Sequence, residues 1–237
     1  MFREQVINYI DKFLSNRGFN LTKEGDKTAQ QLYYSKKEND LIIGIRFLSE
    51  IYENKYFYGF VNCNQVPLVE NIVANILYKN KITAVKPKDI YNTIMTRDYD
   101  EYRLPADGIL IDTEQKSAEV CNLFDRFYNE YFIPFYEKWK DLNVLYEYIK
   151  DKTEEELWDI LGQFAPMKKA VILKLCNDSN YQEFMDSYFQ KQKEYFDEDP
   201  EDIDNIRYYN ASKELKQVLD NTKPIYNGVR KIGFRNR

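Results

Sequence analysis

Two short runs of apolar and aromatic residues between Leu41 and Val61 place the strongest constraint on the fold. In the first run, LIIGIRF, positions 41, 43, 45 and 47 alternate with positions 42, 44 and 46. In the second run, KYFYGFV, positions 56, 58 and 60 alternate with positions 57, 59 and 61. Period-two alternation of β-branched and aromatic residues is typical of strands with one buried face. We therefore expect an antiparallel pair of strands with one face covered by helices.

The segments before this pair predict a helix and more of the sheet. Apolar residues recur every three to four positions over residues 2–16, which predicts an amphipathic helix. Gly18 follows at the place where helices commonly end in a left-handed residue, and Phe19 can fold back onto the last turn. The run QQLYYSKK predicts one or two further strands beside the central pair.

From Asp112 onward the sequence is typical of a series of helices. An apolar stripe begins at Val120 and is expected to end at Pro134, because proline removes a helical N–H group. The later helices carry their own start signals, namely capping residues, prolines and early acidic residues. The expected start signals are Asp112 with Gln115, Asp141, Thr153 with Glu156, Pro166, Ser179 with Gln182, and the acidic run that ends at Asp202.

These patterns predict an α+β fold, in which a small antiparallel sheet covered by helices is followed by a mostly helical C-terminal half. We expect an α+β part over residues 1–111 and a helical part over residues 112–220, packed together as one unit. Residues 221–237 are basic and are expected to form a loosely ordered tail.

The absence of histidine excludes several chemistries. There is no histidine for general-base catalysis near neutral pH, for Ser-His-Asp or Cys-His arrangements, or for histidine-ligated zinc or haem. The eight glycines are scattered and form no phosphate-binding loop. Cys63, Cys121 and Cys176 lie far apart, which favours reduced thiols that serve as small buried apolar groups. The sequence therefore predicts no cofactor.

The charge balance bears on location and partners. The formal net charge of -5 argues against general binding to nucleic-acid phosphates and is compatible with a basic protein partner. The start of the chain mixes charged residues into an amphipathic pattern, unlike a signal peptide. No apolar run approaches the ~20 residues needed to span a bilayer, so we expect a cytoplasmic protein without membrane contact.

Two acidic segments are candidates for a site. Asp98, Asp100 and Glu101 could supply oxygen ligands to Mg²⁺ or Ca²⁺, although a solvated polar loop is the simpler interpretation. A denser acidic run lies further along and is interpreted first as a solvated junction between two helices, and second as a docking surface for a basic partner. The docking candidates in this run are Asp197, Glu198, Asp199, Glu201 and Asp202.

Aromatic residues supply the other candidates. The stripe from Phe124 to Trp139 is expected to be core, although it holds more aromatic residues than one helix needs to bury. Tyr33, Tyr56 and Tyr58 on the predicted sheet are candidates for an interface, because tyrosine is enriched in protein interfaces.

The layout resembles that of a group of known families. The segment FLSNRGFNL closes the first helix and is followed by an aromatic antiparallel sheet, a long helix and a helical tail. This order over the first half of the chain is similar to uncharacterised bacterial α+β families, some of which are similar to the immunity proteins of polymorphic toxin systems. The resemblance implies an acidic cytoplasmic protein that binds and blocks a toxin domain, and it assigns no functional residue.

The sequence as a whole favours a non-enzymatic protein-binding module, of which an immunity-type protein is one form. The alternative is a carboxylate- or metal-dependent enzyme whose site gathers residues such as Asp98, Asp100 and Glu101 from distant segments.

Overall fold

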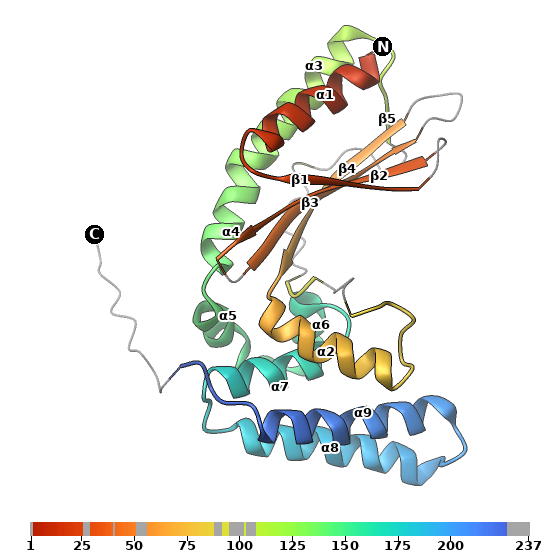
Figure 1. Cartoon of the computed structure of the whole chain (residues 1–237), viewed down its shortest axis with the longest axis vertical. Coiled ribbons are helices and arrows are strands. Elements are labelled where there is room, and N and C mark those ends of the chain that lie inside the picture. The colour runs from red at the N-terminus through yellow and green to blue at the C-terminus, as the bar shows by residue number, and fades with distance from the viewer. Residues whose placement is uncertain are drawn as a thin grey trace. The chain divides into compact units, whose positions relative to one another are not determined.

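The computed structural model describes residues 2–25, 29–39, 41–50, 56–87, 92–94, 102 and 108–226, with the backbone alone at 29–30, 48–50 and 56–58. The chain divides into two compact units (Figure 1). The sheet unit comprises residues 1–65 and 94–140, and the helical unit comprises residues 66–93 and 141–237. This division differs from the expected boundary after residue 111, because the chain passes between the units three times.

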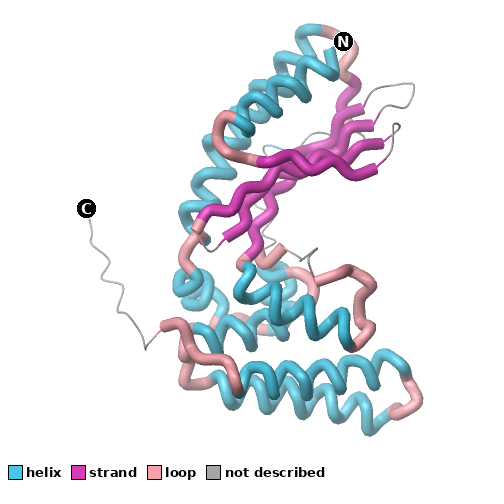
Figure 2. The backbone as a smooth tube through the Cα atoms, in the orientation of Figure 1, coloured by secondary structure: helices cyan, strands magenta, loops and turns pink. Residues whose placement is uncertain are grey.

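The sheet unit confirms the α+β fold class. Its described strands form one antiparallel sheet in sequence order (Figure 2). The strands are β1 (Asn20–Gly25), β2 (Ala29–Glu38), β3 (Leu41–Glu50), β4 (Tyr56–Gln65) and β5 (Ile109–Leu110). The expected central pair is therefore β3 and β4, and the run before it supplies β2.

A shift in register interrupts the alternation between β3 and β4. Arg46 pairs with Val61, but Leu48 pairs with Tyr58, so one residue of β4 has no counterpart on β3. Such a bulge breaks the period-two pattern of the strand that carries it. The bulge lies between Tyr58 and Val61, within the run for which alternation was expected.

Helices cover one face of this sheet. They are α1 (Phe2–Ser15), α3 (Glu114–Arg126), the π-helix η2 (Phe127–Phe132) and α4 (Ile133–Trp139). The ring of Phe60 on β4 lies 5.2 Å from that of Phe124 and 5.4 Å from that of Phe127. The whole aromatic stripe is buried, as expected for core: Phe124, Phe127, Tyr128, Tyr131, Phe132, Phe135, Tyr136 and Trp139.

The end of α1 confirms the role expected of Gly18. Its φ angle is +81°, and its N–H group donates to the carbonyl of Ser15 at 3.0 Å. The N–H group of Phe19 donates to the carbonyl of Leu14 at 3.1 Å, and the Phe19 side chain is buried. These two bonds form a Schellman motif, which satisfies carbonyl groups at the helix end and directs the chain into β1.

The expectation that the long helix ends at Pro134 is wrong. Helical structure runs from Glu114 to Trp139, and the N–H group of Ile133 donates to the carbonyl of Tyr128, five residues earlier. The wider π-turn lies directly before Pro134, which takes an early position of α4 and is exposed. A local π-helix is a known way for a helix to accommodate such an irregularity.

The helical unit contains, among its described residues, α2 (Pro67–Lys79), α5 (Leu142–Ile149), α6 (Glu154–Leu161), α7 (Ala165–Leu175), α8 (Tyr181–Glu198) and α9 (Ile203–Asp220). The capping box of Thr153 and Glu156 and the cap at Asp141 are confirmed. Two expected caps are wrong, because α3 is capped by Thr113 and α8 begins after Asn180 with no side-chain cap.

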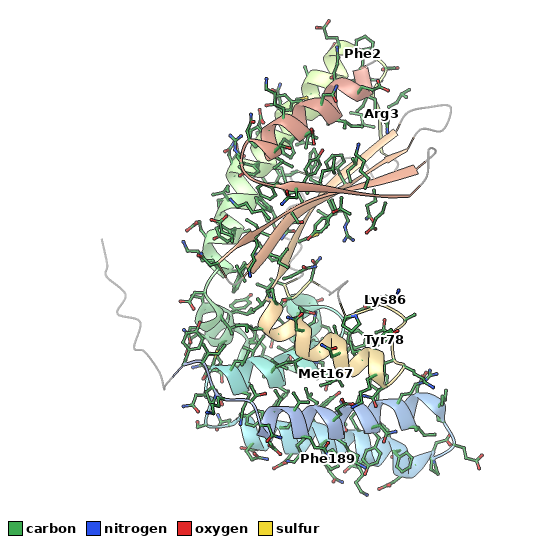
Figure 3. The ribbon with its side chains drawn as sticks, in the orientation of Figure 1. Phe2, Arg3, Tyr78, Lys86, Met167 and Phe189 are labelled. Carbon is green, nitrogen blue, oxygen red and sulfur yellow. The ribbon has the colours of Figure 1, made fainter. Side chains whose placement is uncertain are left out.

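Helix α7 lies at the centre of this unit. Nine of its eleven residues are buried, and it packs on α2, α5, α6, α8 and α9. Helices α8 and α9 run antiparallel as a hairpin, with the ring of Phe189, labelled in Figure 3, 5.7 Å from that of Tyr209. A helix buried on all sides shows no amphipathic stripe, so its start is marked mainly by Pro166.

We predict that Gly44→Ala destabilises the protein by about 1–3 kcal/mol, because a larger group would overpack the sheet. A Cβ atom at Gly44 would lie 2.5 Å from a ring carbon of Tyr33 and 2.8 Å from the carbonyl oxygen of Tyr34. Urea denaturation measures the effect. Gly18→Asn is the control: its Cβ would have room, 3.9 Å from the nearest Lys36 carbon, and asparagine tolerates positive φ. Equal stability of Gly44→Ala and the wild type would contradict the prediction.

Candidate functional site

The sheet candidates and the acidic candidates belong to different units. Tyr33 lies on the face of β2 opposite to Tyr34, with its ring across Gly44 and 5.2 Å from the guanidinium carbon of Arg46. Burial raises the pKa of Tyr33 to about 12. Its half-buried ring is thus engaged in packing within the sheet unit.

Tyr56 and Tyr58 are placed by their backbone alone. Tyr56 pairs with Leu110 on β5, and Tyr58 pairs with Leu48 on β3. Asp98, Asp100 and Glu101 lie outside the described residues. The role of these residues stays a prediction.

The acidic run forms the turn between α8 and α9, as expected for a helix junction. Asp199 accepts hydrogen bonds from the N–H groups of Glu201 and Asp202, both at 3.2 Å. Asp202 caps α9 by accepting from the N–H groups of Asp204 at 2.8 Å and Asn205 at 2.9 Å. Asp199 and Asp202 therefore shape the turn, while Asp197, Glu198 and Glu201 present exposed carboxylates.

This division of roles predicts different effects on stability. Asp202→Ala should destabilise the protein by about 1 kcal/mol, because it removes the cap of α9. Glu198→Gln should change stability by less than about 0.5 kcal/mol, as is usual for an exposed residue with no such role. Thermal denaturation of both variants tests the assignment, and an equal loss in both would refute it.

An aromatic cavity lies beside this turn, within the helical unit. It has a volume of about 280 Å³ and is bounded by α6, α7, α8 and α9. Met167 on α7, labelled in Figure 3, is part of its wall. We define the aromatic cavity by the five aromatic residues that line it, Trp158, Phe164, Tyr188, Tyr195 and Tyr208.

Two of these rings are open to solvent. Trp158 is 48% exposed and Tyr195 is 44% exposed. Burial raises the pKa of Tyr188, so this phenol stays protonated well above neutral pH. The cavity thus combines the partly buried Tyr188 with the exposed rings of Trp158 and Tyr195, a combination suited to noncovalent binding.

One ion pair crosses the cavity wall. The Lys191 ammonium lies 2.8 Å from a carboxylate oxygen of Glu154, and both side chains are about half exposed, at 44% and 53%. The hydrogen bond to Glu154 raises the pKa of Lys191. Lys191 also lines a smaller hollow of about 110 Å³, together with Phe184 on α8 and Lys169 on α7.

The aromatic cavity adjoins the acidic turn. Asn205 lines the cavity, and its side-chain amide donates to the carbonyl of Tyr195 at 2.9 Å and to that of Asp199 at 3.3 Å. Ile203, also in this region, is 56% exposed. Exposed apolar groups and exposed carboxylates are therefore neighbours at this end of the hairpin.

Sequence reasoning identified the acidic turn but not the aromatic cavity. Trp158 lies at the edge of the buried stripe of α6, which is formed by Leu157, Ile160 and Leu161. The position of Trp158 could have indicated a binding surface, because a large aromatic residue beside the buried stripe of a helix gains nothing from exposure to water. Tyr195 offered no comparable signal among the many tyrosines of the chain.

A third hollow, of about 630 Å³, is more polar. Tyr146 and Lys169 line it, and the Tyr146 hydroxyl donates to Asp178. The Lys169 ammonium donates to the carbonyl of Lys152 at 3.1 Å, and burial lowers the pKa of Lys169. The charges in this hollow are mixed: Lys150 and Lys169 lie near Asp151, Asp178 and Glu183.

A buried ion pair is the other unusual electrostatic feature. The Lys168 ammonium lies 3.4 Å from a carboxylate oxygen of Glu70, with exposures of 1% and 0%. Lys168 also donates to the carbonyls of Asn92 at 2.6 Å and Leu161 at 2.9 Å. Burial raises the pKa of Glu70 and lowers that of Lys168, and each partner opposes the shift of the other. Because both side chains are sealed from solvent, we assign the pair a structural role.

We predict that Lys168→Met destabilises the protein by about 3–5 kcal/mol, because it leaves an uncompensated buried carboxylate. The loss should be smaller at pH 5 than at pH 8. The pKa of Glu70 is higher in the folded protein than in the unfolded chain. A carboxyl group of this kind contributes stability that is fully present below its unfolded pKa and is lost as the pH rises through its folded pKa.

Urea denaturation at the two pH values measures the effect. The double variant Glu70→Leu/Lys168→Met is the matched control, and it should recover most of the loss because no buried charge remains. A single variant as stable as the double variant would refute the structural role.

Comparisons with known proteins place this chain in no family. No family model, no curated protein and no solved structure matches it. In the part of the chain that the structure describes, no helix is both long and apolar enough to cross a membrane.

Proposed function

We propose that this protein is a non-enzymatic binding module that recognises a basic protein partner through the helical unit. The observation that carries the proposal is the aromatic cavity beside the acidic α8–α9 turn. We name the joint surface of cavity and turn the hairpin surface. It comprises the five cavity aromatics together with Asp197, Glu198 and Glu201.

The aromatic part of this surface supports binding affinity. Tryptophan and tyrosine are enriched among the residues that dominate interface energies. Trp158 and Tyr195 present large rings to solvent, and Ile203 adds an exposed apolar side chain. Covering these groups would bury apolar area that now faces water, at roughly 25 cal/mol per Å² before the costs of association.

The acidic part supports the choice of partner. Residues 194–204 carry seven acidic side chains and no lysine or arginine. Lys193 and Arg207 at its borders pair with Asp197 and Asp204 and offset only part of this charge. A basic partner would be attracted to this surface, with faster association that weakens as salt is added.

An immunity-type role is the specific form of this proposal that the sequence favours. In that form the partner is a basic toxin domain, and binding blocks its active surface. Co-expression of such a domain with this protein would then restore growth, and it would not do so with a variant that lacks the hairpin surface.

The alternative is an enzyme that uses carboxylates or a metal ion. Its candidate residues, Asp98, Asp100 and Glu101, lie outside the described residues, so this hypothesis rests on the sequence. Among the described residues, no group of three or more cysteine, aspartate or glutamate side chains is arranged to hold a metal ion. Titration with Mg²⁺ and Ca²⁺, followed by calorimetry, tests the alternative.

The main test is capture of a partner by a photo-crosslinking residue placed at Tyr195, followed by calorimetry with the purified partner. We expect a basic protein to be crosslinked at low salt and lost at high salt. The variant Asp197→Asn/Glu198→Gln/Glu201→Gln spares both capping residues and should weaken binding about 10-fold, at about 0.5 kcal/mol for each exposed charge.

Two controls separate the hairpin surface from general electrostatics. A crosslinking residue at Tyr148, which is 43% exposed on α5, should capture much less of the same protein. Neutralising three exposed acidic residues of the sheet unit, Glu24, Glu119 and Glu137, should leave the affinity unchanged. Equal weakening by both triple variants would mean that only net charge matters, and the proposal would fail.

A further inference from the structure

We propose that the aromatic cavity receives an arginine side chain of the partner, whose guanidinium exchanges with Lys191 at the carboxylate of Glu154. The inference rests on the proposed function and specifies which side chain of the partner the hairpin surface recognises.

The size of the cavity favours a single side chain. Pockets for drug-sized ligands and cofactors usually span about 300–1,000 Å³. The aromatic cavity has about 280 Å³, just below that range. It opens beside exposed Trp158 and Tyr195, so a side chain can enter from a partner that covers the hairpin surface.

The chemistry of the wall favours a planar cation. Five aromatic residues line the cavity, and aromatic faces attract cations through their electron-rich centres. Guanidinium is planar, is more weakly hydrated than ammonium, stacks on aromatic rings and binds carboxylates through two parallel hydrogen bonds. Glu154 supplies such a carboxylate within the same wall.

Lys191 already occupies the position of a cation at this wall. Its ammonium lies 2.8 Å from Glu154, and the hydrogen bond that raises its pKa reflects stabilisation of positive charge there. Because both side chains are about half exposed, the pair contributes little to stability. An incoming guanidinium can therefore displace Lys191, which reaches solvent on its flexible stem.

The exchange has a distinctive consequence for variants of Lys191. If the cavity receives a cation, Lys191→Met removes a competitor and should tighten binding of a guanidinium probe about 2- to 5-fold, the fold-change that an exposed ion pair can supply. If the cavity instead binds an anionic group, the same variant should weaken binding. If it binds an apolar group, the variant should tighten binding of the neutral probes as much as that of the arginine probe.

The test uses nuclear magnetic resonance of the full chain with N-acetyl-arginine N-methylamide as the probe. The two tryptophans provide an internal comparison, since Trp158 lines the cavity while Trp139 is 2% exposed in the sheet unit. We expect the Trp158 indole signal to shift saturably at millimolar probe while the Trp139 signal stays in place. The neutral citrulline and leucine analogues should shift it far less.

Variants complete the test. Trp158→Ala, read through backbone amide signals of α8, and Glu154→Gln should each weaken the arginine probe about 5- to 10-fold or more, from loss of the cation–π contact or of the carboxylate. Tyr148→Ala should not change it. An equal response to citrulline and arginine, or weaker arginine binding by Lys191→Met, would overturn the inference.

These outcomes are separable from failure of the proposed function. A partner crosslinked at Tyr195 with unchanged affinity for the Glu154→Gln variant would leave the binding module intact and remove the arginine site. A saturable shift of the Trp158 signal by the arginine probe, without any salt-sensitive partner crosslinked at Tyr195, would keep the arginine site and remove the proposed binding module.

Discussion

The stability of the helical unit depends on a buried ion pair, because its central helix α7 is buried on every side and carries a lysine. Helix α7 carries Lys168 into the centre of the unit, where Glu70 and two carbonyl groups surround its ammonium. An unpaired charge in such surroundings would cost several kcal/mol, so the pairing fixes α2, the end of α6 and the segment at residue 92 around α7. The remaining helices can then pack on α7 through apolar contacts.

The hairpin surface follows from the lengths of the helices around this centre. Helices α8 and α9 have 18 residues each and α7 has 11, which correspond to roughly 27 Å and 16 Å. The hairpin is therefore about 10 Å longer than α7, on which both of its helices pack, and α9 also packs on α2. At the turn end of the hairpin the chain carries exposed acidic residues and Ile203, while Tyr195 lines the aromatic cavity together with residues of α6 and α7.

Much of the local structure could be predicted because its causes are local. Gly18 and Phe19 end α1 through two backbone bonds within six residues, and Thr153 with Glu156 starts α6 through a capping box. The strands β3 and β4 follow from alternation, which reflects burial of one face. By contrast, the helix through Pro134 was missed, because a π-turn that depends on the packing of η2 overrode the usual effect of proline.

The sequence predicted only one of the two parts of the candidate site, because only that part depends on residues that are neighbours in the chain. The acidic turn is contiguous in sequence, whereas the aromatic cavity gathers Trp158, Phe164 and Tyr195 from three separate segments.

By itself, the sequence determined the α+β class, the aromatic core, most helix starts and the acidity of the α8–α9 turn, because these depend on composition and on neighbours within one or two turns. Only the tertiary structure decided that α2 belongs to the helical unit, that α3 and α4 belong to the sheet unit, and that the acidic turn adjoins an aromatic cavity. Those outcomes depend on which apolar faces meet across long stretches of chain, and many pairings of such faces satisfy the same local pattern.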